Sequence, residues 1–242
     1  MKTYLICGKN WPRAEHAKRQ LEQLGMGYSI QNAVYLTQKN HNNSPLTLAE
    51  QGCAMAHLAI YEQMVNDNIS SAIVLEDDGV FTQNLWRQIP NDLSRHFDIV
   101  LLGRSKLAAE EFFFSDWIFP IQPIVNLGKY SIGHPWKLRK KGAVGYWISI
   151  HGAKQLLMQN YSLQYVADDW PAYSEKAKIG EIRPLVVFED TVSFGSEIEE
   201  SRTGKQNMIK RMTKRKLFGR LLKGLIQSII IKTLKKSNYT PM

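Results

Sequence analysis

Three adjacent carboxylates, Glu76, Asp77 and Asp78, form the most informative chemical feature of the sequence. They directly follow the apolar run 71–75, which is typical of a buried strand. In open α/β sheets, ligands bind beyond the carboxyl ends of the strands. Divalent cations prefer carboxylate oxygens and can bridge them to a diphosphate. An acidic turn that caps a following helix explains the same residues, so both interpretations stay open at this point.

Asp168 and Asp169 form a second acidic pair, immediately before Trp170 and Pro171. Acidic residues and proline are favoured in the first turn of a helix, so ordinary capping accounts for the pair. The functional alternative is a general base, which requires a carboxylate within reach of an acceptor hydroxyl.

Packing and chemistry also compete as explanations for His57 and Arg13. His57 lies four residues after Cys53 on a predicted helix, so the two side chains share a face. Two ligands do not make a zinc site, and we therefore interpret His57 as a packed or hydrogen-bonded core residue. Arg13 follows the first predicted strand, where it would meet a phosphate or a base; a solvated helix residue is the alternative.

The elements that must position these side chains alternate between strands and helices. Apolar runs predict strands at 3–7, 28–35, 71–75, 97–102, 143–150 and 182–188, the last broken by Pro184. Periodicity and capping signals predict helices at 12–24, 47–65, 83–94 and 152–160, with another starting at 168. We expect 104–142 to be irregular, with short strands and long loops. This alternation predicts an α/β domain with a mostly parallel, Rossmann-like sheet flanked by helices.

Charge divides the chain into a body, 1–204, and a tail, 205–242. The net charge is +9, yet the tail holds eleven of the 31 Lys and Arg residues and none of the 22 Asp and Glu residues. In the tail, aliphatic residues recur at helical spacing from Leu217 to Ile230, which predicts a basic amphipathic helix. Such a helix fits an anionic membrane surface. Docking on the body or on a second subunit is the alternative, and the broad aliphatic face disfavours nucleic acid as a partner.

The cysteine content and the hydrophobic runs give expectations about the compartment. Cys7 and Cys53 are the only cysteines and form no C-x-x-C pair, which favours reduced thiols over a disulfide framework or a thiolate zinc site. The start of the sequence lacks the long apolar stretch of a signal peptide, and no window has the length and apolarity of a membrane span. We therefore expect a cytoplasmic protein that is peripheral on a membrane.

Several blocks of the sequence resemble glycosyltransferase family 25, which includes lipooligosaccharide galactosyltransferases and glucosyltransferases and collagen galactosyltransferase domains. The strongest block is 50–78, where E-Q-G-C-A-M-A-H and a strand ending in L-E-D-D are similar to the family pattern, with Ala56 in place of a family serine. Weaker similarities occur at 32–34, 145–157, Asp168-Asp169 and 196–198. The resemblance covers about residues 1–204, and the tail lies outside it.

The resemblance implies a GT-A-type fold, a UDP-hexose donor, Mn²⁺ or Mg²⁺, and inversion at the anomeric carbon. By position, 76–78 takes the place of the D-x-D motif, so Asp78 and Glu76 are the expected metal ligands. The expected catalytic base is Asp169, with Asp168 as the alternative. The residues expected to contact the donor are Arg13, His57, Glu76, Asp77 and Glu197.

The expected function is therefore inverting transfer of a hexose, galactose first and glucose second, to a lipooligosaccharide or lipopolysaccharide core acceptor. A homo-oligomer is compatible with the sequence. The competing functions are a metal-dependent phosphohydrolase or nuclease and a non-catalytic, membrane-associated adaptor. The basic loop 134–141 offers contacts to acceptor phosphates, although a solvated loop explains it equally well.

Overall fold

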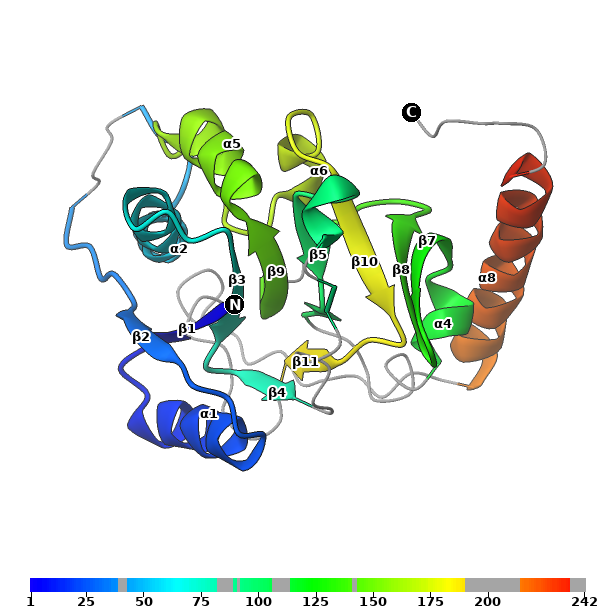
Figure 1. Ribbon diagram of the computed structural model, residues 1–242, viewed down its shortest axis with the longest axis horizontal. Coiled ribbons are helices and arrows are strands. Elements are labelled where there is room, and N and C mark those ends of the chain that lie inside the picture. Colours follow the sequence, from blue (N-terminus) through cyan, green and yellow to red (C-terminus); the bar gives the residue numbers. More distant parts are fainter. Residues whose placement is uncertain are drawn as a thin grey trace.

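The computed structural model describes residues 1–38, 43–81, 89–90, 92–105, 114–140, 143–189 and 214–235. One sheet of eight strands forms the centre of the molecule, in the order β2-β1-β3-β9-β5-β10-β8-β7 (Figure 1). Its strands are β1 (Lys2–Cys7), β2 (Ser29–Asn32), β3 (Ser71–Glu76), β5 (Ile99–Leu101), β7 (Ile121–Leu127), β8 (Tyr130–Pro135), β9 (Gly145–Ser149) and β10 (Ile179–Arg183). A second sheet contains β4 (Gly79–Phe81), β11 (Val187–Glu189) and β6 (Gly103–Arg104), in that order.

Strand direction confirms the expected α/β class. Within the described part of the large sheet, six strands run in one direction, and only β9 and β8 oppose their neighbours. The helices that accompany the sheets are α1 (Trp11–Gln23), α2 (Leu48–Asn66), α4 (Ser115–Ile118), α5 (Ile150–Asn160), α6 (Trp170–Tyr173) and α8 (Lys214–Lys235), with a short 3₁₀ helix, η2 (Leu93–Arg95). The result is a mostly parallel, Rossmann-like sheet flanked by helices.

Alternate side chains of each strand belong to two separate cores, one on each face of the sheet. In β1, Leu5 packs with α1 in the first core, whereas Tyr4 packs with α2 and α5 in the second. Figure 1 shows α2 and α5 together on one side of β1, β3 and β9, with α1 on the other. Both faces of the central strands are therefore covered, which explains why β3 is an uninterrupted apolar run.

Local sequence signals set the ends and the position of α2, the helix that carries Cys53 and His57. Thr47 and Glu50 form the predicted capping box, each side chain accepting from the other residue's backbone N–H. One turn further on, Gly52 lies against the chain that follows β2. A Cβ atom there would meet the Val34 carbonyl oxygen at 2.1 Å, so only glycine allows this approach.

Several element boundaries differ from those expected from sequence. The strand predicted at 28–35 is limited to β2. The run 182–188 forms two strands in different sheets, β10 and β11, on either side of a cis peptide bond before Pro184. Of the helix predicted at 83–94, the structure describes only η2 and three neighbouring residues, because 82–88 and 91 lie outside the described residues.

The region 104–142 is more regular than we expected. It contributes α4 and a hairpin, β7 and β8, which pairs antiparallel and extends the large sheet through β10. A bulge between Pro123 and Val125 interrupts the alternation along β7, and Gly128 turns the hairpin with a positive φ. These irregularities hid the strand periodicity that would have predicted the hairpin.

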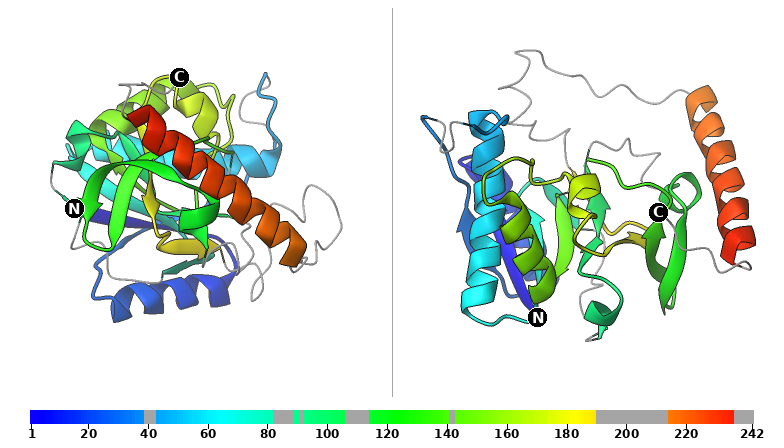
Figure 2. Two further views of the ribbon diagram at one scale, coloured as in Figure 1. Left: turned by 90° about the vertical axis from the view of Figure 1, so that its right-hand side faces the viewer. Right: turned by 90° about the horizontal axis from the view of Figure 1, so that it is seen from above.

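The expected tail helix is present as α8, and it docks on the body along α4 and β7 (Figure 2). At the closest approach, Gly224 lies directly over the Trp117 carbonyl group. Intramolecular docking, one of the alternatives from sequence, is thus confirmed for this helix. Among the described helices, none has the length and apolar character needed to cross a membrane.

Candidate active site

The middle acid of the 76–78 motif, Asp77, fastens the end of β3 to the segment that follows β1. One carboxylate oxygen accepts a 2.7 Å hydrogen bond from the Gly8 backbone N–H, and the other lies 2.6 Å from Arg13 Nε. Asp77 is 2% exposed. The structure therefore brings two expected donor-binding residues, Arg13 and Asp77, together as a buried ion pair that shapes the edge of the site.

Asp78, the expected metal ligand, is surrounded by other acids. Its Oδ1 atom is buried and has no hydrogen-bond partner among the described residues. Burial raises the pKa of Asp78 well above its usual value, and the charges of Glu76 and Glu189 raise it further. A buried carboxylate oxygen without a donor is costly unless a proton or a cation occupies it. These donors fit a hard divalent cation, which accepts several carboxylate oxygens.

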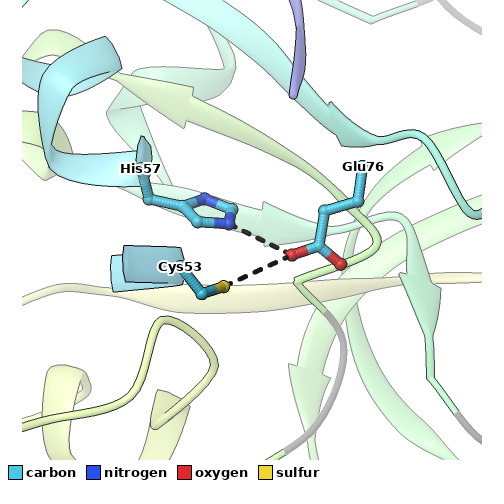
Figure 3. Close-up of side chains that lie close together, drawn as sticks. All are labelled: Cys53, His57 and Glu76. Carbon is cyan, nitrogen blue, oxygen red and sulfur yellow. Dashed lines mark hydrogen bonds and ion pairs between the residues drawn. The ribbon is translucent and has the colours of Figure 1, made fainter. Parts of the chain in front are cut away.

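A chain of hydrogen bonds that begins at His57 of α2 holds Glu76, and Figure 3 shows the contact between these two side chains. Its Oε1 lies 3.2 Å from His57 Nε2, and His57 Nδ1 lies 2.7 Å from the Tyr146 hydroxyl group. The Tyr146 hydroxyl in turn lies 2.5 Å from that of Tyr61. The chain thus runs from the buried core on the α2 side to the end of β3, and it fixes the direction of the Glu76 carboxyl group.

Burial favours the neutral forms of His57 and Glu76 in this chain of hydrogen bonds. It lowers the pKa of His57 to about 4, so the imidazole is neutral at pH 7. Burial also raises the pKa of Glu76, and the charges of Asp168, Glu189 and Asp77 act in the same direction. The His57–Glu76 contact is therefore a hydrogen bond that orients the carboxyl group rather than a strong ion pair.

Cys53 approaches the same carboxyl group from one turn earlier in α2, with its Sγ 4.0 Å from Glu76 Oε1. The ligand atoms of Cys53, His57 and Glu76 lie within 4.8 Å of one another, a spacing that could hold a metal ion. Burial and the Glu76 charge raise the pKa of the Cys53 thiol, which disfavours the thiolate that a metal would need. Both ring nitrogens of His57 are already engaged, as expected for a hydrogen-bonded core histidine.

The structure separates the roles of the second acidic pair. Asp169 is 4% exposed, caps α6 through a 3.4 Å contact from the Ala172 N–H, and lies 2.6 Å from Lys140 Nζ. Asp168 is only partly buried, and its charge acts on Glu76, Cys53 and His57. Asp168 therefore faces the acidic cluster, whereas both oxygens of Asp169 contact groups of the protein itself.

Glu189, at the end of β11, is an acid of this site that we did not predict. It pairs with Gly79 across the small sheet, and its charge raises the pKa of both Glu76 and Asp78. The signal was available, because Glu189 and Asp190 follow an apolar strand just as 76–78 does. The last expected donor-binding residue, Glu197, lies outside the described residues.

The acidic side chains that meet at this edge of the sheets come from three separate parts of the sequence. The acids that influence one another's ionisation are Glu76, Asp78, Asp168 and Glu189. Such a concentration of negative charge at the carboxyl end of β3 suits a cation and the diphosphate that it would neutralise.

Comparison with known proteins identifies the family. A family model described as "Glycosyltransferase family 25 (LPS biosynthesis protein)" matches residues 1–170. The chain is 34% identical over 122 residues to a "Glycosyltransferase 25 family member" of Aedes aegypti, covering 48% of this chain and 18% of that protein. It is 27% identical over 171 residues to "Procollagen galactosyltransferase 1-B" of Xenopus laevis, covering 60% of this chain and 26% of that protein.

The chain thus spans about a quarter or less of the length of these relatives. The matched residues nevertheless include the whole 50–78 block, with its three acids, and the acidic pair Asp168-Asp169. The match extends over more than half of the chain and confirms the resemblance seen in its sequence: the chain belongs to glycosyltransferase family 25.

Proposed function

We propose that this chain transfers a hexose from a UDP-sugar to a hydroxyl group of a saccharide acceptor, with inversion at the anomeric carbon. The observation that carries the proposal is the acidic cluster at the end of β3, in which buried Asp78 Oδ1 has no donor from the described residues. Family membership supports the same reading of the cluster.

Mn²⁺ or Mg²⁺ is the proposed cofactor, with Asp78 as its principal ligand and Glu76 beside it. When bound, the ion would neutralise the charge that develops on the UDP leaving group. The His57 ring holds the Glu76 carboxyl group in place, so the cluster is organised before substrate arrives. Arg13 contributes indirectly, by holding Asp77 against the strand end.

Asp168 is the better placed of the two candidate bases. Asp169 caps α6 and pairs with Lys140, whereas the charge of Asp168 reaches the cluster. In the proposed reaction, the base takes the proton of the acceptor hydroxyl as that oxygen bonds to the anomeric carbon. The bond between the sugar and UDP breaks in the same step, and UDP departs as a diphosphate that needs no protonation.

Galactose is the first candidate for the sugar and glucose the second. The Xenopus laevis relative is named as a galactosyltransferase, which supports galactose. A lipooligosaccharide or lipopolysaccharide core is the proposed acceptor, in keeping with the description of the matched family. A phosphohydrolase and a non-catalytic adaptor are weaker alternatives, because neither accounts for the match over residues 1–170.

Release of UDP from a panel of UDP-sugars, with and without Mn²⁺, tests the proposal. Truncated lipooligosaccharide serves as the acceptor. We expect metal-dependent release from one donor, increased by the acceptor. If no donor releases UDP and UDP does not bind, the acids are structural and the proposal is wrong.

We also propose that α8 holds the protein on an anionic membrane surface. Its docked face leaves a stripe of aliphatic and aromatic side chains exposed: Phe218, Leu222, Leu225, Ile226, Ile229 and Ile230. Next to this stripe, Lys216, Arg220 and Lys223 are exposed on the adjoining face. Apolar burial and cationic charge on neighbouring faces suit a surface of anionic lipid. Action at the cytoplasmic face of the membrane stays a prediction from the sequence.

A further inference from the structure

A group of arginines lies outside the acidic cluster, at the end of β10. Arg104 donates two hydrogen bonds to Glu181, of 2.8 and 2.7 Å, and Arg183 pairs with the same carboxylate. Arg104 and Arg183 are each 5% exposed. One buried carboxylate, that of Glu181, therefore pairs with two buried guanidinium groups.

A third guanidinium group, that of Arg139, lies near the same two arginines at the Phe119 ring. The Arg104, Arg139 and Arg183 guanidinium carbons lie 4.2, 5.3 and 6.0 Å from the centre of the Phe119 ring. Arg183 Nε also donates a 2.7 Å hydrogen bond to the Phe119 carbonyl oxygen. Arg139 is exposed and, among the described residues, pairs with no carboxylate.

The balance of charge and the hydrogen bonding at these arginines both favour the binding of an anion. Asp116 is the other described acid whose charge reaches Arg183, so among the described residues three guanidinium groups face two carboxylates. The Nε atom of Arg104 is buried and has no hydrogen-bond partner within the part of the chain that the structure describes. A buried charged donor without an acceptor is costly, and phosphate or carboxylate oxygens are the acceptors that guanidinium groups match best.

The position of this group relates it to the acidic cluster. In the small sheet, Phe188 of β11 pairs with Arg104 of β6, and the next residue, Glu189, pairs with Gly79 of β4. Two strand spacings, about 10 Å, therefore separate the β6 backbone from that of β4. An anion at the arginines would lie beside the transfer site, on the far side of β11 from Asp78.

We propose that Arg104, Arg139 and Arg183 form an oxyanion site that binds a phosphate or carboxylate group of the acceptor substrate. The identification of the ligand as an acceptor rests on the proposed transferase function. The oxyanion chemistry itself rests on the arginine group alone. Arg139 is the exposed member through which an anion reaches the two buried guanidinium groups.

Inorganic phosphate is the probe for the test, titrated at constant ionic strength into the full chain. The readout is the ¹⁵N–¹H signal of the arginine Nε–H groups. The side chains of Arg104 and Arg183 are buried, which protects their Nε–H protons from exchange with solvent. We expect a saturable shift of the Arg104 signal. Arg139→Gln should weaken phosphate binding roughly tenfold, the effect of losing one charge-assisted hydrogen bond. Lys137→Gln removes an exposed charge from the same loop and should leave binding unchanged.

A parallel titration with UDP and Mn²⁺ distinguishes an acceptor group from the donor diphosphate. We expect UDP affinity to be equal in the wild type and in Arg139→Gln, and phosphate not to compete with UDP. Absence of a saturable phosphate shift, or equal weakening by Lys137→Gln, would overturn the oxyanion site. Competition between phosphate and UDP would show that the arginines bind the diphosphate of the donor, and it would overturn the proposal that they bind an acceptor group. Phosphate binding without any UDP binding would instead count against the transferase function alone.

Discussion

The three acids at the end of β3 have different roles although they are adjacent in sequence. Asp77 binds Gly8 and Arg13, Glu76 is oriented by His57, and Asp78 alone keeps a buried oxygen without a donor from the described residues. Glu76 is the last residue of β3, whereas Asp77 and Asp78 form the turn that leads into β4, so the three side chains do not share the alternation of one strand. Of the three, Asp78 is the one whose charge most needs a cation.

Asp78→Asn tests this assignment. We expect turnover of the UDP-sugar to fall by about 100-fold or more, because an electrostatic contact to the leaving group is lost. Without metal, the thermal stability should rise, since burial and neighbouring charges hold the pKa of Asp78 above its unfolded value. At a pH below the pKa of the unfolded state, the carboxyl group is protonated and its contribution to the free energy of unfolding is fully present. That contribution is lost as the pH rises through the pKa of the folded state.

Activity and thermal melting of the wild type and Asp78→Asn, with and without Mn²⁺, provide the measurement. Mn²⁺ should raise the melting temperature of the wild type and have little effect on the variant. Wild-type turnover in Asp78→Asn would show that this carboxylate does not hold the metal.

Tyr146 is the residue through which the core holds His57. Tyr146→Phe removes the hydroxyl group that contacts both His57 Nδ1 and the Tyr61 hydroxyl. A buried ring nitrogen then lacks a partner, so we expect the free energy of unfolding to fall by about 1–3 kcal/mol. We also expect kcat to fall, because Glu76 loses its fixed orientation.

Tyr61→Phe is the matched control for that variant, since it leaves the Tyr146–His57 contact in place. Its loss of stability in urea unfolding should be the smaller of the two. If Tyr61→Phe lowers kcat as much as Tyr146→Phe, the effect comes from general loosening of the core rather than from the orientation of Glu76.

For single residues, the sequence predicted which residue types would meet at the site but not which contacts each side chain would make. The apolar strand before Glu76 was sufficient to locate the site, and helical spacing placed Cys53 and His57 on one face. The choice between Asp168 and Asp169 depends on Lys140, which is distant in sequence and pairs with Asp169. The Arg104–Glu181 pair likewise joins residues 77 positions apart, a contact that no local pattern reports.

Among the elements, α8 depends most on a single close contact with the body. At Gly224, an added Cβ would lie 1.6 Å from the Trp117 carbonyl oxygen, whereas at Gly219 it would meet nothing within 4 Å. Gly224→Ala should therefore separate α8 from α4, while Gly219→Ala should keep the helix docked. Because alanine favours helix, Gly219→Ala should also stabilise α8 by up to about 1 kcal/mol.

Hydrogen exchange of the α8 backbone amides distinguishes these outcomes. Most of the stability of a helix in a protein comes from packing of its amphipathic face, so the amides of Gly224→Ala should exchange faster than those of the wild type. The amides of Gly219→Ala should exchange more slowly. Equal exchange in the two variants would mean that the docked position contributes nothing to the stability of α8.

Element prediction succeeded where the sequence pattern was regular. Capping and periodicity located α2 to within one residue at each end, because Thr47 and Glu50 mark its start in the sequence itself. The β7–β8 hairpin was missed because a bulge breaks its alternation. The apolar run 182–188 predicts one strand, because sequence alone does not show that the residues on either side of Pro184 belong to different sheets.

The whole molecule places the acidic cluster and α8 at different ends of the large sheet. The cluster lies at the carboxyl end of β3, the third strand in the order, whereas α8 lies along β7, the last strand (Figure 2). A membrane contact through α8 would therefore leave the transfer site uncovered. This separation allows catalysis and membrane binding to be disrupted independently.

Charge reversal on α8 tests the membrane contact. Lys216→Glu, Arg220→Glu and Lys223→Glu, combined in one variant, should weaken binding to phosphatidylglycerol-containing vesicles by 100-fold or more, at about 1 kcal/mol for each lost cation. Sedimentation of the protein with the vesicles measures the effect. UDP binding by the same variant should be unchanged.

The control carries the same change in net charge on the body, at the exposed residues Lys137, Lys154 and Lys176. If both triple variants lose vesicle binding equally, overall charge rather than α8 attracts the protein to the lipid. If only the α8 variant loses it, the apolar stripe can be tested next with Ile229→Ser, which should weaken binding without altering the salt dependence. Retention of full vesicle binding by the α8 variant would show that these three cations do not hold the protein on the lipid.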